Sequence, residues 1–303
     1  MNKEQKSKTS RLTVLRWLLR VIQGSLIGGS AILPGISGGV LCVIFGIYQP
    51  MMELIAHPFR AFKKHVWLLL PVLIGFVIGF LGLARLVEWL FTVSSSMTIW
   101  LFFGLIAGMG PSLYKEAGKQ GRPKSALISF VISFVVVLGL LIYLGNSAAL
   151  NIQPNIWWFF VCGLMWGVSL IAPGLSSSSL LIFLGLYEPM AAGIGNLDMS
   201  VIIPLGIGAV LLVLVSARAI NHLFNKYYPV IFHVVLGFVL ASTIMTVVPT
   251  NQTESISYTG TLVEILSCAG CAIGGFLVAW FMDKAGQKLQ YDTEKGPLVS
   301  QNE

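Results

Sequence analysis

Long apolar segments separated by short polar ones fill the chain between about residues 14 and 282. Six of these segments are long enough to cross the roughly 30 Å hydrocarbon core of a bilayer as helices. The predicted spans are 66–90, 98–114, 125–145, 201–221, 230–248 and 261–282. Two further apolar segments, 14–55 and 157–193, are each interrupted by a Pro-Gly pair, which ends a helix. The pattern predicts an all-α polytopic membrane protein with two broken helical hairpins and polar tails at 1–13 and 283–303.

The two broken segments are copies of one another. Residues 24–51 read GSLIGGSAILPGISGGVLCVIFGIYQPM and residues 163–190 read GLMWGVSLIAPGLSSSSLLIFLGLYEPM, with 12 of 28 positions identical. The aligned positions include Pro34-Gly35 with Pro173-Gly174, Gly46 with Gly185, Pro71 with Pro204, Gly75 with Gly208, Ala84-Arg85 with Ala217-Arg218, and Gly104 with Gly237. The last span of each copy aligns too weakly to use. We therefore predict two repeats, 14–145 and 157–282, an organisation typical of transporters with interrupted helices.

Glycines four residues apart recur in the apolar segments, and such pairs favour close helix contacts. The pairs are Gly24 with Gly28, Gly75 with Gly79, Gly104 with Gly108, and Gly270 with Gly274. We expect most of these contacts to lie within the chain.

Composition places the chain in lipid. It is 56% hydrophobic and only 10% charged, whereas soluble domains carry about 25% charged residues. Its net charge of +7 does not indicate nucleic-acid binding, because the basic residues lie between apolar segments and form no single basic face.

The basic residues predict the topology. They concentrate in both tails and in the segments 57–65, 115–124 and 218–226. Placing all of them in the cytoplasm puts both termini inside, starts and ends the first hairpin inside, and starts and ends the second outside. Three spans separate the hairpins, so the second repeat is predicted to be inverted. Each hairpin is then either re-entrant or a pair of full spans, and its short apolar arms favour a re-entrant hairpin.

Each Pro-Gly break is followed by glycines or hydroxyl residues that begin a new helix. The predicted anion-binding residues are Gly35, Ser37, Gly38 and Gly39 in the first copy, and Gly174, Ser176, Ser177 and Ser178 in the second. Unpaired amides at a helix start carry the positive end of the helix dipole and commonly bind phosphate. With inverted repeats, the two tips would meet near the bilayer midplane. The alternative is that these residues only shape and cap kinked helices.

Arg85 and Arg218 form the second repeated polar pair, and a guanidinium suits a phosphate group well. Alternatively, each arginine reaches the membrane interface from a helix end, and Arg85 has Glu88 in position for an ion pair. Glu53, Glu188 and Glu264 are further candidates for carrying a coupling proton.

No metal or cofactor is predicted. The spacing of Cys268 and Cys271 suits redox or metal chemistry, but no second cysteine or histidine pair accompanies them. We expect all four cysteines to pack between helices.

The segments ILPGISGGVLCVIFGIYQPM (32–51) and LIAPGLSSSSLLIFLGLYEPM (170–190) resemble the PopT-type polyprenyl-phosphate transporters, over about residues 11–284. The resemblance implies a flippase that moves undecaprenyl phosphate from the outer to the inner leaflet of the bacterial plasma membrane. Such transport recycles the lipid carrier of cell-wall precursors. The expected partners are this lipid and the surrounding membrane lipids, and no nucleic acid.

Two other functions compete with this hypothesis. The same pair of tips would serve a transporter or channel for a small soluble anion. A membrane enzyme such as a lipid phosphatase needs a nucleophile with a general acid or a metal, and the few histidines and acids of this chain form no such group. We therefore expect a transporter rather than an enzyme.

Overall fold

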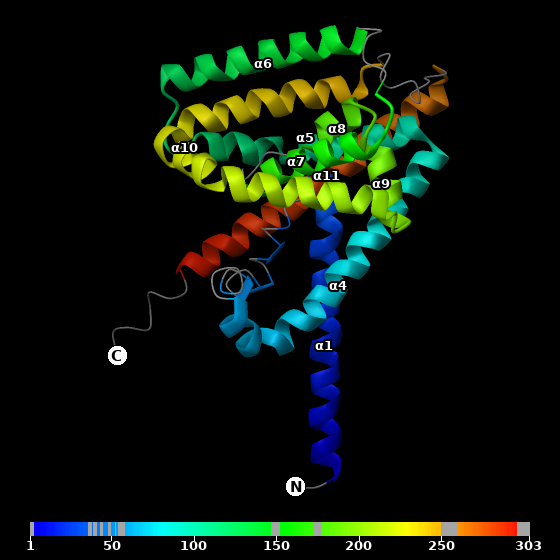
Figure 1. The fold of residues 1–303 in the computed structure, drawn as a ribbon, viewed down its shortest axis with the longest axis vertical. Helices are drawn as coiled ribbons and strands as arrows, with labels where there is room; N and C mark the ends of the chain where they lie inside the picture. The colour runs from blue at the N-terminus through cyan, green and yellow to red at the C-terminus, as the bar shows by residue number, and fades with distance from the viewer. Residues whose placement is uncertain are drawn as a thin grey trace. The chain divides into compact units, whose positions relative to one another are not determined.

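The computed structural model describes residues 3–35, 38, 41–42, 45–47, 50–51, 53, 58–146, 152–171, 177–249 and 260–295. Every regular element within these residues is an α-helix (Figure 1). The helices are α1 (Lys3–Ile32), α4 (Pro58–Val93), α5 (Ser95–Ala117), α6 (Lys124–Asn146), α7 (Ile156–Ile171), α8 (Ser178–Phe183), α9 (Tyr187–Gly195), α10 (Met199–Val247) and α11 (Leu262–Lys295).

Six helical segments among these residues are long and apolar enough to cross a membrane. They are Lys64–Val93, Ser95–Ala117, Lys124–Asn146, Met199–Ser216, Lys226–Val247 and Leu262–Ala285. Each overlaps one of the six spans predicted from hydropathy. Large apolar side chains are exposed along them, for example Val131, Val135 and Val136 on α6. The prediction of an all-helical polytopic membrane protein is confirmed at this level.

The fourth and fifth spans are two helical parts of α10, which meet where Tyr227 takes non-helical angles (φ −126°, ψ 35°). The chain reverses direction there (Figure 1). Pro229 follows two residues later, and a proline removes one helical hydrogen bond and clashes with the carbonyl four residues before it. Tyr227 and Pro229 therefore separate the two predicted spans without a long loop.

The chain divides into two compact units, residues 1–84 with 281–303 and residues 85–280, which are described separately. In the first unit, α1 contacts α4 through glycines on both helices. A Cβ added to Gly24 or Gly28 of α1, or to Gly75 or Gly79 of α4, would clash with the backbone of the facing helix. The predicted glycine pairs thus bring the two backbones together, as small residues do in membrane helix pairs.

In the second unit, α7 makes the equivalent contact with the first part of α10. Gly163 and Gly208 occupy the positions of Gly24 and Gly75, and an added Cβ at either would again clash with the facing backbone. The residues that they face also correspond in the alignment: Val72 with Leu205, and Val21 with Phe160. The first helix pair of each repeat is therefore built in the same register.

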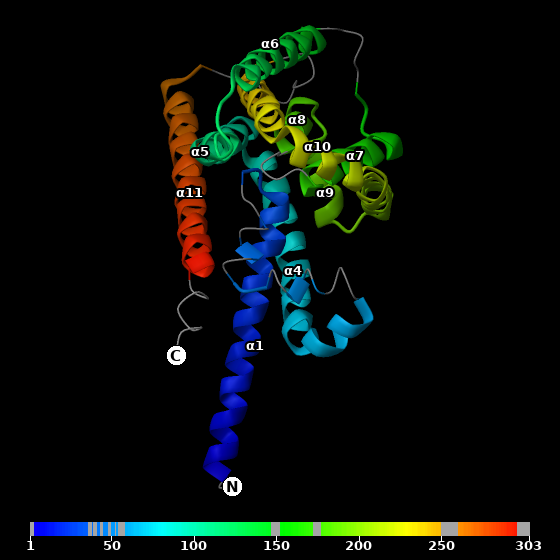
Figure 2. The same ribbon diagram turned by 90° about the vertical axis from the view of Figure 1, so that its left-hand side faces the viewer.

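The last helix of each predicted repeat packs against the other repeat. Gly104 of α5 lies against Ala272 and Phe276 of α11, and its counterpart Gly237 in α10 lies against Phe130 and Phe134 of α6. Both α11 residues lie 142 positions after their α6 counterparts. Figure 2 shows α11 beside α5 and α6 beside α10. The structure thus supplies the register of the last helices that sequence comparison could not.

The remaining contacts in these pairs fit the same register. Ser133 of α6 donates a hydrogen bond to the Val234 carbonyl at 2.8 Å, and the matching Gly275 of α11 lies against the backbone of Leu101. The prediction for Gly270 and Gly274 is wrong, because a Cβ at either would meet no atom within 4 Å. Gly275 makes the contact instead, since one residue turns a helical position by about 100°.

Candidate functional site

The first Pro-Gly break ends α1 where the sequence predicts. The helix stops at Ile32, and Gly35 takes a φ of +82°. Beyond the turn, Gly38 lies against α1, because an added Cβ would be 2.9 Å from the Ser30 Oγ. The chain therefore folds back on itself at this break. Ser37 and Gly39 lie outside the described residues.

The second break falls at residues 172–176, outside the described residues, so the predicted positions Gly174 and Ser176 receive no structural account. Ser177 follows directly and is buried. Its backbone N–H donates to the Ser169 Oγ at 3.0 Å, and the Ser169 hydroxyl donates to the Ser177 Oγ at 3.0 Å. These bonds join the two sides of the break, so this segment also folds back as a hairpin.

The second arm of each hairpin contains the same glycine turn. In the first copy the Ile47 N–H donates to the Cys42 carbonyl at 2.8 Å, and in the second the Leu186 N–H donates to the Leu181 carbonyl at 2.9 Å. The glycine between, Gly46 or Gly185, has a φ of +66° or +68°. This six-to-one bond around a left-handed glycine is a Schellman turn, which satisfies carbonyls that a helix end leaves unpaired.

In the second hairpin, the glycine turn divides the second arm into two short helices. Helix α8 has 6 residues and α9 has 9, which correspond to lengths of roughly 9 and 14 Å. Neither helix alone crosses a hydrocarbon core of about 30 Å. Sequence analysis predicted the break at the tip of this hairpin but did not predict the division of its second arm into two helices.

Buried hydroxyl groups connect the second hairpin to α10. Ser179 of α8 and Ser242 of α10 share a hydrogen bond of 2.8 Å, and both are fully buried. The Thr246 hydroxyl donates to the Ser242 carbonyl at 2.9 Å. Sequence analysis gave no role to Ser169, Ser242 or Thr246. Hydroxyl residues inside otherwise apolar helices could have indicated these contacts, because a buried hydroxyl needs a hydrogen-bond partner.

Arg85 caps a helix end. Its Nε donates to the carbonyl of Gly195, the last residue of α9, at 2.7 Å. A cation is favourable there because the C-terminal end of a helix carries partial negative charge. Glu88 accepts a hydrogen bond from Asn196 at 2.9 Å, and no ion pair joins Glu88 to Arg85 in the described part of the chain. Arg218 lies on α10, but its side chain is not among those that the structure describes.

Two of the candidate carboxylates have local partners. Glu53 accepts from the Lys64 ammonium at 2.9 Å and is paired with His65. The hydrogen bond from Lys64, followed by that from His65, lowers the pKa of Glu53 below its usual value. The Glu264 carboxylate accepts from the Gly260 N–H at 3.1 Å beside the start of α11. Both side chains thus stabilise local structure.

Within the residues that the structure describes, no group of three or more His, Cys, Asp or Glu side chains lies close enough to hold a metal ion. The four cysteines, Cys42, Cys162, Cys268 and Cys271, form no disulfide.

The six apolar helices and two folded-back hairpins define a polytopic membrane protein. A family profile described as undecaprenyl phosphate translocase-like matches residues 27–262, and the chain belongs to this family.

Two curated relatives carry the name polyprenyl-phosphate transporter. The Vibrio cholerae protein is 23% identical over 270 residues, which cover 83% of this chain and 85% of the relative. The Staphylococcus aureus protein is 24% identical over 264 residues, which cover 83% of this chain and 93% of the relative. No solved structure matches the chain.

Proposed function

We propose that this protein transports polyprenyl phosphate across the bacterial plasma membrane, with undecaprenyl phosphate as its substrate. The observation that carries the proposal is family membership over residues 27–262, together with two relatives named polyprenyl-phosphate transporter. Transport runs from the outer to the inner leaflet and returns the carrier of cell-wall precursors to the cytoplasmic side. Both termini are cytoplasmic, as the distribution of basic residues favours.

The phosphate group requires a site with hydrogen-bond donors inside the membrane. We assign it to the two Pro-Gly tips, with Gly35, Ser37, Gly38 and Gly39 from one hairpin and Gly174, Ser176, Ser177 and Ser178 from the other. Glycine allows close approach of the backbone, and serine hydroxyls add donors. The division of the second hairpin's second arm into helices of 6 and 9 residues supports a re-entrant hairpin that turns back before crossing the bilayer.

The observed hydrogen bonds refine this assignment. The Ser177 N–H already donates to Ser169, so Ser177 would offer its hydroxyl rather than its backbone. The Arg85 Nε already donates to Gly195, so its terminal nitrogens would contact a phosphate. A guanidinium has five N–H donors, and one bond leaves four. Arg218 is the matching candidate in the second repeat.

Transport then needs movement and no covalent step. If the repeats are inverted, rocking one against the other exposes a site between them to each leaflet in turn. The phosphate stays among polar donors while the isoprenoid tail remains in lipid. The protein therefore acts as a carrier and not as an enzyme.

A reconstituted system tests this proposal. Purified protein is placed in liposomes with a polyprenyl phosphate that carries a fluorophore at the tail end, and movement between leaflets is followed by quenching from outside. We expect the wild-type protein to accelerate movement, and Ser37→Ala, Ser176→Ala or Arg218→Gln to slow it about tenfold or more, since a hydrogen bond to a charged group contributes about 1.5–3 kcal/mol.

Ser129→Ala is the matched control, because the Ser129 hydroxyl donates to the carbonyls of Ala126 and Val230 and lies more than 40 residues from either break in sequence. It should transport like the wild type. Uptake of inorganic phosphate by liposomes that lack the polyprenyl lipid would favour the soluble-anion transporter instead. Release of phosphate from the lipid by purified protein would identify an enzyme and contradict the proposal.

A further inference from the structure

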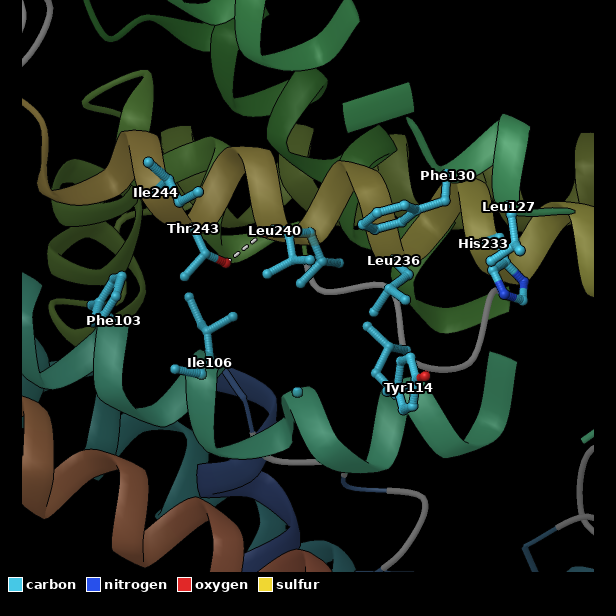
Figure 3. A pocket seen from close by; sticks show the side chains of 14 residues that line it. Phe103, Ile106, Tyr114, Leu127, Phe130, His233, Leu236, Leu240, Thr243 and Ile244 are labelled. Carbon is cyan, nitrogen blue, oxygen red and sulfur yellow. Dashed lines mark hydrogen bonds between the residues drawn. The ribbon is translucent and has the colours of Figure 1, made fainter. Parts of the chain in front are cut away.

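An apolar groove lies between α5, α6 and the second part of α10, away from the two Pro-Gly breaks in sequence. Its volume is about 460 Å³, within the range of pockets that bind small molecules. Figure 3 shows Tyr114, Leu127 and His233 towards one end, and Phe103 and Ile244 towards the other. Phe103 and Tyr114 are 11 residues apart on α5, so the groove extends roughly 16 Å along the helix.

Two of the polar side chains in the wall, Thr243 and His233, are turned towards their own backbone. The Thr243 hydroxyl donates to the Val239 carbonyl at 2.6 Å, the bond drawn in Figure 3. The His233 Nδ1 lies 2.6 Å from the Pro229 carbonyl, and this side chain is 2% exposed. The groove therefore offers aliphatic and aromatic surface along most of its length, which suits a hydrocarbon chain and not a polar solute.

Two cationic side chains, Arg122 and Lys124, lie towards one end of the groove. The Arg122 guanidinium lies 3.8 Å from the centre of the Tyr114 ring and donates to the Tyr114 hydroxyl at 2.6 Å. Lys124 is exposed at the first position of α6, three residues before Leu127, and so shares a helix face with this lining residue. The nearby Glu116 is paired with Lys119. Neither Arg122 nor Lys124 forms an ion pair within the part of the chain that the structure describes, so both can attract an anion.

We propose that this groove binds polyprenyl phosphate in the inner leaflet, with part of its isoprenoid tail along the groove and its phosphate at Arg122 and Lys124. The inference rests on the proposed function and adds a second lipid site to it. The basic segment 115–124 is predicted to be cytoplasmic, so the groove runs from that face towards the bilayer centre. A lipid in the inner leaflet has this orientation, and the groove is where substrate docks after crossing.

Gly110 allows the groove to be filled without disturbing the helices. It lines the groove, and a Cβ added there meets no atom within 4 Å. Gly110→Leu should therefore occupy the space of the tail. Gly139→Leu is the matched control, because Gly139 also lies in a membrane helix, has no atom within 4 Å of an added Cβ, and does not line the groove.

The test uses a polyprenyl phosphate with a photoreactive diazirine in the isoprene units nearest the phosphate. Purified wild-type protein in nanodiscs is irradiated, and the labelled peptides are mapped by mass spectrometry. We expect label on residues 103–114 of α5 and 236–244 of α10, reduced about tenfold by Gly110→Leu and unchanged by Gly139→Leu. A double variant, Arg122→Gln with Lys124→Gln, should weaken labelling several-fold, whereas Lys119→Gln should not.

The groove assignment is overturned if wild-type protein moves the lipid in liposomes but carries no label on these two segments. It is also overturned if unlabelled polyprenol or phosphatidylglycerol competes as well as unlabelled polyprenyl phosphate, because the groove would then hold any lipid chain. Failure of the proposed function is distinguishable, since wild-type protein would then neither move polyprenyl phosphate between leaflets nor bind it anywhere. Wild-type mapping does not depend on how any variant folds.

Discussion

The two hairpins share a backbone plan and differ in the polar groups that hold it. Both second arms contain a Schellman turn at matched glycines, Gly46 and Gly185. Across the breaks, Ser30 faces Gly38 in the first copy, and the aligned Ser169 faces Ser177 in the second. Among the described residues, Ser30 donates to the Ile27 carbonyl of its own helix, at 2.6 Å, whereas Ser169 and Ser177 join the two arms.

The cations that contact the second arm also differ between the two copies. In the first copy the Arg20 guanidinium donates to the Phe45 carbonyl at 2.9 Å, at the end of the second arm. Its counterpart in the second copy is Phe159. In the second copy Arg85 of α4 instead donates to the Gly195 carbonyl at the end of α9, and buried hydroxyls add bonds at the tip. Backbone geometry is what the two copies retain, while each stabilises that geometry with different side chains.

The helix contacts common to both copies should give the largest effect. Gly75→Ala and Gly208→Ala each place a Cβ against the backbone of the facing helix. We expect each to lower the free energy of unfolding by about 3 kcal/mol or more, because neither backbone can yield without separating the helices. Unfolding of the purified protein in denaturing detergent measures this loss.

Gly82→Ala is the control for that experiment, since Gly82 is also in α4 and an added Cβ there meets no atom within 4 Å. It should leave stability unchanged or raise it slightly. Wild-type stability in one glycine variant and not the other would show that the two helix pairs are not equivalent.

The matched turn glycines should give the next largest effect. Gly46→Ala and Gly185→Ala force a side chain into the left-handed region, at a cost of about 1–2 kcal/mol in each copy. Asparagine at either position should recover part of this loss, because it tolerates that conformation better. Thermal unfolding provides the comparison, with Gly206→Ala in open space as control. Equal stability of the alanine and asparagine variants would contradict the turn assignment.

The serine bonds should separate the copies. Ser169→Ala removes both bonds across the break and should cost about 1 kcal/mol, whereas Ser177→Ala keeps the bond from its backbone N–H and should cost less. The double variant should cost little more than Ser169→Ala, because it removes no further bond. Ser30→Ala should cost less, because the bond described for its hydroxyl is to its own helix. A double-mutant cycle measures the coupling. Additive losses at Ser169 and Ser177 would show that the bonds across the break contribute nothing.

The ion pairs of Glu53 should have the smallest effect, and only in the first copy, where the aligned residue of the second is Ala192. The folded state lowers the pKa of Glu53 through Lys64 and then His65. Its stabilisation is therefore present above the ordinary glutamate pKa and disappears as the pH falls through the lowered value. Melting temperatures of wild type and Glu53→Gln should converge as the pH falls from 7 to about 3. A gap that widened in acid would reverse this sign.

Local sequence was informative where single residues control the backbone. Pro34 and Gly35 predicted the end of α1, which stops at Ile32. Apolar segments predicted six spans, because a segment that crosses the bilayer usually forms a helix to pair its backbone N–H and C=O groups. The alignment of Gly46 with Gly185 indicated a shared position, which in the structure is the glycine turn. The pairing of Ser37 and Ser176 in one phosphate site stays a prediction.

The sequence by itself determined where helices begin, break and carry glycine, since these depend on neighbouring residues and on the solvent around them. Only the tertiary structure decided that α11 packs against α5 and α6 against α10, that Ser169 bonds Ser177, that Arg85 caps α9, and that an apolar groove lies beside Arg122. Each of these joins residues distant along the chain. Apolar helices in lipid have many partners of similar hydrophobicity, so the fit of small residues and a few hydrogen bonds selects among them.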